Sequence, residues 1–340
     1  MELTQFGDIS PRTAGYASKE LLKRGAIAVV TDRFGQPKPI PKNSGKTITF
    51  RRYNALLPAT APLAEGVTPT GQKLTSTDVS CTLEQYGDLV SITDVIADTH
   101  EDRVLNEAIQ LCSEQIKETI ETVRIAALKG GTNVFYAGGV ATRLLVTSPV
   151  LRADLRKINR SLAKQKGKVI GTINKAGNRI ATEPVAAAYF ALGHTDLDSD
   201  IRNIAGFVSI ESYSDSDKAL PYEIGKVENI RFVLTPYFTP WLVAATQATG
   251  TTYLSGGVEP ATALGPDVYP LLIVAQDAYG IVPLQGENAV TPTVLNPNKP
   301  DKSDPLGQKG FVAWKMWQAL VILNQNWLVR LEVACTANPT

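Results

Sequence analysis

The chain contains 340 residues, of which 44% are hydrophobic and 20% are charged, a globular composition that excludes a mostly disordered protein. Its 34 Lys and Arg residues nearly balance its 33 Asp and Glu residues, so the formal net charge is +1. A dedicated nucleic-acid-binding protein usually carries a clear basic excess. The composition therefore argues against that class of protein and leaves room only for a local basic patch.

Residues 1–46 carry little periodic pattern. The run 25–30 (GAIAVV) predicts a short strand. Pro37, Pro39 and Pro41 then enforce extended, non-helical backbone. We expect an arm that lies on something else and does not form a domain by itself.

The next segment predicts a projecting two-stranded hairpin. Residues 47–53 (TITFRRY) alternate as a strand does, and 79–96 return to strand-like composition. Between them, 58–78 is rich in Pro, Gly, Thr and Ser and offers little apolar material to pack. Because a lone hairpin is marginally stable in water, two interpretations stand: a disordered surface loop, or a hairpin that lies on a neighbouring subunit.

The strongest local signal is a long helix over 100–129, a segment without Gly or Pro. Apolar residues fall at steps of three and four, which predicts one buried stripe. Thr99 is placed to cap the start and Gly130 to end the helix. Cys112 lies on the apolar stripe, so we expect it to be a core thiol.

A second helix is predicted over 149–166, followed from 168 onward by a mixed region of short strands and turns with a short helix near 197–205. The second helix carries a basic face whose members are Arg152, Arg156, Arg160 and Lys164. One interpretation is a solvated face whose cations favour the helix C-terminus. The other is a contact with an anionic partner, either carboxylates of a protein or nucleic acid. The chain ends in apolar, strand-like runs over 310–334.

Sequence motifs for catalysis are missing. No dinucleotide-binding fingerprint, phosphate-binding loop or nucleophile elbow occurs, and His100 and His194 stand outside any metal-binding or catalytic pattern. The acidic run 196–200 (DLDSD) superficially resembles a calcium loop, but Ile201 and Phe207 occupy the places that need glycine and glutamate. We therefore predict that the chain is not an enzyme and has no catalytic or cofactor-binding site.

The three cysteines also argue against a metal centre. Cys81, Cys112 and Cys335 are far apart and lack a CxxC partner, which leaves almost nothing for zinc. Scattered, odd-numbered cysteines favour buried thiols and folding in a reducing compartment. No run of 18 apolar residues and no secretory signal is seen, so we expect no membrane contact.

The order of these elements resembles the major capsid protein of tailed bacteriophages, the Hong Kong-97 fold. Several stretches are similar to the N4-like major capsid protein family within it, namely 51–69, 83–95, 126–139, 222–236 and 310–315. The resemblance implies an α+β Hong Kong-97-type capsid fold with an N-terminal arm, an extended loop hairpin, a long spine helix, a peripheral domain and an axial domain. The implied bounds are 1–46 for the arm, 54–82 for the extended loop, 47–53 with 83–146 and 306–340 for the peripheral domain, 100–129 for its spine helix and 147–305 for the axial domain.

The resemblance also implies a function. Such a chain self-assembles as pentamers and hexamers into the icosahedral head shell around the double-stranded DNA of a tailed phage, after folding in the host bacterial cytoplasm. Its partners are other copies of itself, with scaffolding, portal and decoration proteins as further candidates and weak non-specific contact with packaged DNA. A decoration-protein site is a candidate for 250–305, and the family's covalent cross-link cannot be placed on residues of this chain.

Charges on or beside the hairpin are candidate inter-subunit contacts: Arg51, Arg52, Glu65, Lys73 and Asp78. Three alternatives stay open at this point. The first is an encapsulin-like protein compartment, which shares the fold, and the second is a motif-less cytosolic α/β enzyme. The third is a weak nucleic-acid-binding module based on the basic face.

Overall fold

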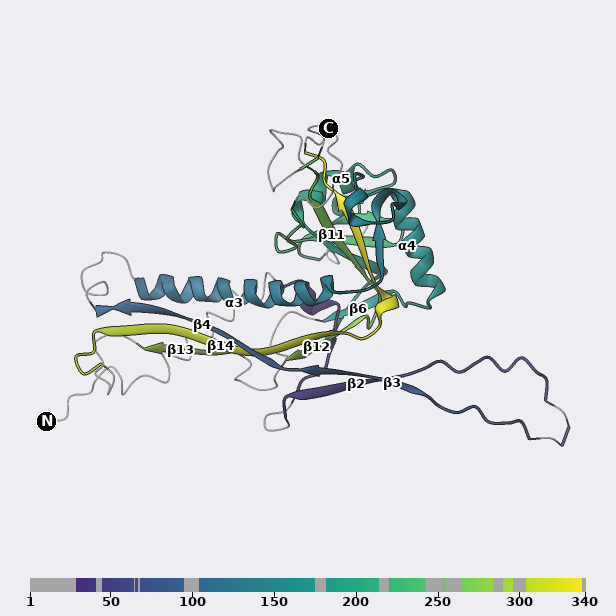
Figure 1. Cartoon of the computed structure of the whole chain (residues 1–340), viewed down its shortest axis with the longest axis horizontal. Helices are drawn as coiled ribbons and strands as arrows, with labels where there is room; N and C mark the ends of the chain where they lie inside the picture. The colour runs from purple at the N-terminus through teal and green to yellow at the C-terminus, as the bar shows by residue number, and fades with distance from the viewer. Residues whose placement is uncertain are drawn as a thin grey trace.

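The computed structural model describes residues 29–40, 45–94 except 64 and 67, 104–174, 182–213, 220–242, 253–254, 265–283, 290–295 and 304–337. These residues form two layered bodies, each with its own sheet, and a long hairpin that projects from them (Figure 1). Helices and strands are both well represented, which confirms the α+β class.

The first body is a five-stranded sheet built around the long strand β14. The strand order is β1-β12-β14-β13, and β4 also pairs with β14. Pairing is antiparallel except between β1 and β12. The strands are β1 (Gln36–Pro37), β4 (Glu84–Thr93), β12 (Tyr279–Pro283), β13 (Val290–Leu295) and β14 (Lys309–Ile322).

The long helix α3 (Val104–Lys129) lies along this sheet, as its apolar stripe predicts (Figure 1). Cys112 and Ile116 on the helix pack against Trp314 and Met316, which project from the same face of β14 because they are two residues apart. Gly130 and Gly131 follow the last helical residue, at the position where the sequence places the stop. The expected start of the helix, with the Thr99 cap, lies outside the described residues.

The second body is an eight-stranded sheet with the order β5-β15-β11-β7-β10-β9-β8, in which β6 also pairs with β7. Every residue of β10 and β11 is buried. Continuous burial of this kind is typical of strands covered on both faces, and the one charged residue in these two strands, Arg231, pairs with Glu223 on β9. The strands are β5 (Val134–Tyr136), β6 (Ile170–Asn174), β7 (Thr182–Gly193), β8 (Val208–Ser209), β9 (Glu223–Val227), β10 (Ile230–Leu234), β11 (Val268–Val274) and β15 (Leu328–Ala334).

Helix α4 (Arg152–Lys164) covers one face of the eight-stranded sheet through Leu155, Ile158 and Leu162, which are fully buried. It is shorter than the expected 149–166, because the backbone of Leu151 is still extended. The short helix predicted near 197–205 is α5 (Asp198–Arg202). Single turns of 3-10 helix complete the described elements: η1 (Thr31–Arg33), η2 (Ala137–Gly139), η3 (Arg143–Leu145), η4 (Thr195–Leu197), η5 (Ile210–Ser212) and η7 (Gln325–Trp327).

The predicted hairpin is confirmed, with a difference in its second strand. Strand β2 (Thr47–Tyr53) pairs with β3 (Ser76–Thr82), and the two legs between them extend far from the body (Figure 1). The single strand expected over 79–96 is two strands, β3 and β4, divided at Leu83. Leu83 is buried in a small cluster with Phe50 and Cys81, so it fixes the point where the chain leaves the hairpin and joins the five-stranded sheet.

The two sheets divide the chain differently from the expected domains. Strand β15 lies in the eight-stranded sheet, whereas the resemblance implies that 306–340 belong to the peripheral domain. Strands β12 and β13 lie in the five-stranded sheet, whereas the resemblance implies that 147–305 belong to the axial domain. Strand pairing is non-local, and the order of elements along the chain does not fix it. No helix in the described ranges is long and apolar enough to cross a membrane.

Candidate assembly surfaces

The hairpin is held as a hairpin by contacts between its own legs. Beyond the β2–β3 ladder, the backbone N–H of Asn54 donates to the carbonyl of Thr75 at 2.9 Å. The side chain of Gln72 then spans the legs, accepting from the N–H of Leu57 at 3.0 Å and donating to its carbonyl at 2.9 Å. These contacts keep the two legs together for several residues beyond the strands.

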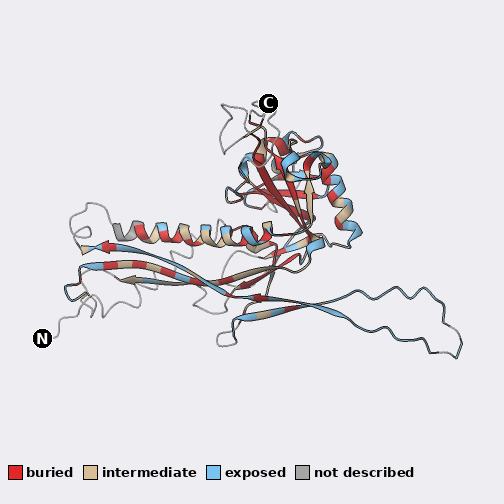
Figure 2. Ribbon diagram, in the orientation of Figure 1, coloured by how far each residue is buried: buried red, intermediate tan, exposed pale blue. Residues whose placement is uncertain are grey.

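The legs nevertheless expose large apolar side chains to solvent. Leu57 is 78% exposed, Leu63 is 77% exposed and Leu74 is 64% exposed, and Tyr53 and Leu56 are exposed beside them. Figure 2 shows the legs as an almost continuous exposed segment, in contrast with the buried interiors of the two sheets. An uncovered apolar segment of this kind marks a surface that another molecule covers.

Two of the five charges predicted at the hairpin pair with each other. Arg51 and Asp78 stand opposite one another in the β2–β3 register, and two parallel hydrogen bonds of 2.8 Å join the guanidinium to the carboxylate. The hydrogen bond from Arg51 lowers the pKa of Asp78, and the same bond raises the pKa of Arg51. This pair therefore fixes the hairpin register within one chain.

The other three hairpin charges are not brought together by the structure. Arg52 is half-buried on β2, whereas Glu65 and Lys73 are exposed on the legs. These three side chains remain candidates for contacts between copies.

The basic face of α4 divides into an occupied half and an open half. Arg152 and Arg156 both reach Glu228 in the turn between β9 and β10, at 2.7 and 2.9 Å. Hydrogen bonds from Arg152 and then Arg156 lower the pKa of Glu228. Arg160 and Lys164, one and two turns further along the helix, are exposed and form no ion pair with any described residue.

A buried ionic cluster, which the sequence analysis missed, joins the end of α3 to the second sheet. Glu332 on β15 is fully buried and accepts from Arg143 at 2.7 Å and from Arg330 at 2.9 Å. Arg330 also donates to the carbonyls of Lys129 and Gly131, where α3 ends and helical partners run out. No sequence motif marks this cluster, because its members come from three separate segments.

Trp241 completes the junction. The guanidinium of Arg143 lies 3.7 Å from the centre of its ring, and the ammonium of Lys129 lies 4.6 Å from it. Burial and the nearby positive charges of Arg143 and Arg330 lower the pKa of Lys129. The junction is therefore cationic and closely packed, which is suited to holding the two bodies in one orientation.

The described part of the arm lies on the body of its own chain. Glu121 on α3 is fully buried and accepts from the hydroxyl of Thr31 at 2.7 Å and from the backbone N–H of Val30 at 3.2 Å. Burial raises the pKa of Glu121, and the bonds from Thr31 oppose that shift. Phe34 is buried against Phe190, so residues 30–34, which precede the prolines and include the 3-10 turn η1, contact both bodies of their own chain.

Metal-binding geometry is not found in the described ranges. No group of three His, Cys, Asp or Glu side chains there is placed to hold a metal ion. In the DLDSD run, Asp196 accepts from the hydroxyl of Tyr269, Asp198 pairs with Arg202, and Asp200 accepts from the N–H of Thr336. The three carboxylates therefore have separate structural partners and do not converge.

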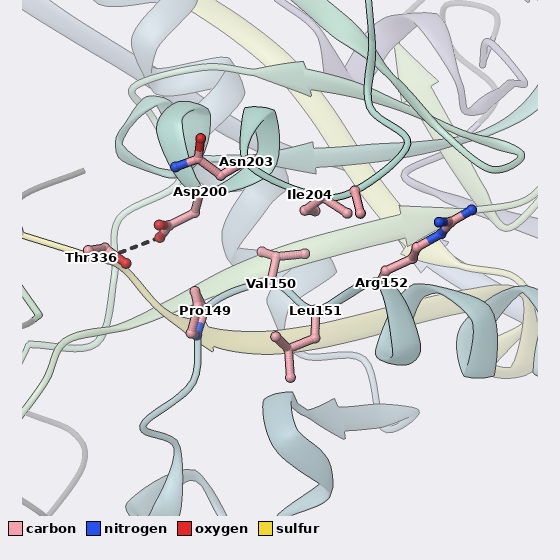
Figure 3. Close-up of a pocket in the computed structure, with 9 residues that line it drawn as sticks. Pro149, Val150, Leu151, Arg152, Asp200, Asn203, Ile204 and Thr336 are labelled. Carbon is pink, nitrogen blue, oxygen red and sulfur yellow. Dashed lines mark hydrogen bonds between the residues drawn. The ribbon is translucent and has the colours of Figure 1, made fainter. Parts of the chain in front are cut away.

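A pocket of about 370 Å³ lies between the start of α4 and α5 (Figure 3). Its wall mixes apolar side chains such as Val150 and Ile204 with the polar side chains of Asn203 and Thr336. Both of its charged members are already engaged, Arg152 with Glu228 and Asp200 with the backbone of Thr336. The pocket therefore presents no free charged group that would select a ligand.

Comparisons with known proteins place this architecture among phage capsids. A sequence model described as "Phage capsid protein" matches residues 76–325. A curated relative, the major capsid protein of Pseudomonas phage KPP21, is 23% identical over 137 residues, which are 37% of this chain. The match spans about a third of that relative's length, at 32%.

Solved structures show the same fold over nearly the whole chain. The capsid of Ralstonia phage GP4 aligns with a TM-score of 0.65 at 11% identity and covers 93% of both chains. The capsid of cyanophage Pam1 aligns with a TM-score of 0.60 at 12% identity, again over 93% of both chains. The head of Helicobacter pylori bacteriophage KHP40 aligns with a TM-score of 0.54 at 12% identity and covers 92% of this chain and 89% of that one.

Proposed function

The chain belongs to the phage capsid protein family, and from that premise we propose how copies of it build a phage head. It is a structural subunit of the head shell with the Hong Kong-97-type capsid fold expected from its sequence. We infer that copies assemble as pentamers and hexamers into an icosahedral shell around the double-stranded DNA of a tailed phage. The N4-like branch within the family stays a prediction.

The observation that carries this proposal is the uncovered hairpin. Its legs project away from both bodies and expose leucines that no described residue covers. A neighbouring copy offers the cover, because a heterologous contact repeated by symmetry gives every hairpin the same partner surface. The Arg51–Asp78 pair keeps the hairpin in register, and Arg52, Glu65 and Lys73 are proposed to select the position at which it lies on the neighbour.

The two bodies take the roles that the family implies. The five-stranded sheet with α3 is proposed as the peripheral domain, and the eight-stranded sheet with α4 is proposed as the axial domain near the fivefold and sixfold axes. The cluster around Glu332 and Trp241 holds the two domains together. A fixed angle between them sets the curvature of the shell.

Partners beyond the chain itself follow from the same role. Scaffolding, portal and decoration proteins are proposed as transient or local partners during assembly in the host cytoplasm. Contact with packaged DNA is proposed to be weak and non-specific, since the net charge of +1 gives little global attraction for a polyanion. A structural role of this kind requires no catalytic residue.

Shortening the hairpin tests the proposal. Replacing 58–71 with two glycines removes the outer legs but keeps β2, β3 and the Leu57–Gln72 bridge. The variant is expected to stay soluble and folded and to form no shells, which circular dichroism and electron microscopy measure side by side. Shells of normal size and yield from the shortened chain would refute the proposed role of the hairpin. Purified particles that hold protein cargo instead of DNA would favour a protein compartment.

A further inference from the structure

Two exposed pairs of like charge lie on two different helices of this chain, and the pairs are opposite in sign. On α3, Glu114 and Glu118 are exposed and four residues apart, so they lie on one face of the helix. We call them the acidic pair. On α4, Arg160 and Lys164 are exposed and also four residues apart, and we call them the basic pair.

The two pairs match in spacing. Four residues of helix rise by about 6 Å at 1.5 Å per residue, so the two charges of each pair are about one helical turn apart. When a helix that carries the basic pair lies against a helix that carries the acidic pair, each cation is therefore able to face one carboxylate.

The face that carries the acidic pair also exposes an apolar side chain. Leu111 lies three residues before Glu114, on the same side of α3, and is 64% exposed. An exposed leucine beside two carboxylates is typical of a surface that a protein partner covers, with an apolar contact flanked by charges. Because Leu111 belongs to the long helix and not to the hairpin, this observation is independent of the exposed legs.

Within one chain the two pairs do not meet. Helix α4 covers the eight-stranded sheet, whereas α3 lies along the five-stranded sheet, and most of α3 is far from α4 (Figure 1). Neither the acidic pair nor the basic pair forms an ion pair with any residue in the described part of the chain. A contact between them therefore needs two molecules.

The positions of the two pairs suit a second copy of this chain. In Figure 1 the hairpin and α4 lie on one side of the molecule, and most of α3 extends to the other side. A head-to-tail neighbour on the hairpin side consequently turns its α3 side toward α4. The charges of the two pairs also favour a second copy as the partner, in a chain whose net charge is only +1. A nucleic-acid partner would explain the basic pair but not the acidic pair.

We propose that the basic pair of one copy docks against the acidic pair of a second copy in the shell. This inference rests on the proposed function and adds a second contact to the one made by the hairpin. Exposed charge pairs are individually weak and screened by salt, so the two pairs set the register and rate of association. Assembly is therefore expected to weaken as salt rises from about 0.1 M to about 1 M.

A charge swap is the first test. One variant carries Arg160→Glu and Lys164→Glu, a second carries Glu114→Lys and Glu118→Lys, and a third combines all four changes. Each double variant places like charges across the contact and is expected to lower particle yield about tenfold, the effect of roughly 1.4 kcal/mol. The combined variant is expected to recover most of the yield, because it restores opposite charges across the contact.

The matched control reverses two exposed lysines elsewhere, Lys309→Glu and Lys315→Glu on β14, which changes the net charge as much as the basic-pair variant does. It is expected to assemble normally. An equal loss of particles in this control, or no recovery in the combined variant, would overturn the proposal.

Cross-linking tests the pairing without a requirement for shells. Chains with Arg160→Cys and chains with Glu118→Cys are co-expressed and treated with a short bis-maleimide, since the three native cysteines are buried. A dimer band is expected from the mixture and from neither variant alone, and its absence from the mixture would refute the contact.

Two further outcomes separate this inference from neighbouring ideas. If the native chain formed no shells or rings, the proposed function would fail, and the cross-link would still decide the pairing. If the basic-pair variant assembled normally but lost affinity for a short DNA duplex, the basic pair would belong to nucleic acid and the pairing of copies would be wrong.

Discussion

Replacing three leucines of the hairpin legs tests how far apolar cover drives assembly. The changes are Leu57→Ser, Leu63→Ser and Leu74→Ser, at side chains that are 78%, 77% and 64% exposed in the isolated chain. Fully burying a leucine contributes about 2 kcal/mol. Covering the exposed parts of all three therefore stabilises the contact by about 4 kcal/mol per subunit, or about a thousandfold in the association constant.

The same changes leave the folded chain nearly untouched, because the three side chains contact little of it. The unfolding temperature of the dispersed variant should match that of the native chain, while sedimentation should show subunits in place of particles. Leu306→Ser is the control, since Leu306 is 76% exposed but lies outside the hairpin. Normal particle yield from the triple variant, or a fall in its unfolding temperature of several degrees, would refute the reasoning.

Two further predictions concern the buried carboxylates. Glu332→Gln leaves Arg143 and Arg330 without a counter-charge and should lower the free energy of unfolding by about 3–5 kcal/mol in denaturant titrations. A loss below about 1 kcal/mol would contradict the role of Glu332 in holding the two bodies together. For Glu121, burial raises the pKa in the folded chain, against opposing bonds from Thr31, so the folded state holds the proton more tightly than the unfolded state does. The contribution of Glu121 to stability is full below its ordinary pKa of 4.5 and is lost as pH rises through the folded pKa. The unfolding temperature of the native chain should therefore fall over this pH range, and that of Glu121→Gln should lack this fall. The same dependence of unfolding temperature on pH in both chains would contradict the prediction.

The elements that the sequence predicts well are those with local signals. The spine helix follows from an apolar stripe without Gly or Pro, and its end follows from Gly130 and Gly131. The hairpin follows from two strand-like runs around a polar segment. Local patterns of this kind decide the elements, and tertiary contacts adjust only their ends.

Features that depend on contacts between distant segments cannot be predicted from local sequence patterns. The break at Leu83 depends on a cluster that joins the hairpin to strands far along the chain. The place of β15 in the eight-stranded sheet depends on its antiparallel pairing with β11, in which Val268 faces Ala334 and Val274 faces Leu328. The domain bounds drawn from chain order consequently differ from the sheets.

The candidate charges show the same limit. Arg51 faces Asp78 because the hairpin pairs Thr47 with Thr82, a register that the sequence alone left open. In the sequence, nothing distinguishes the four cations of the basic face from one another. In the structure, Glu228, far along the chain, forms ion pairs with Arg152 and Arg156 and leaves the other two cations exposed. Which charges are open to a partner is therefore decided by the fold, and the residue pattern only proposes candidates.

Electron microscopy of the purified protein, with size-exclusion elution beside it, tests the central claim most directly. The account predicts closed shells tens of nanometres across, or rings of five or six subunits, in which the hairpin of each copy lies on its neighbour. A monodisperse monomer or dimer at every salt concentration, with the hairpin legs still exposed, would contradict it.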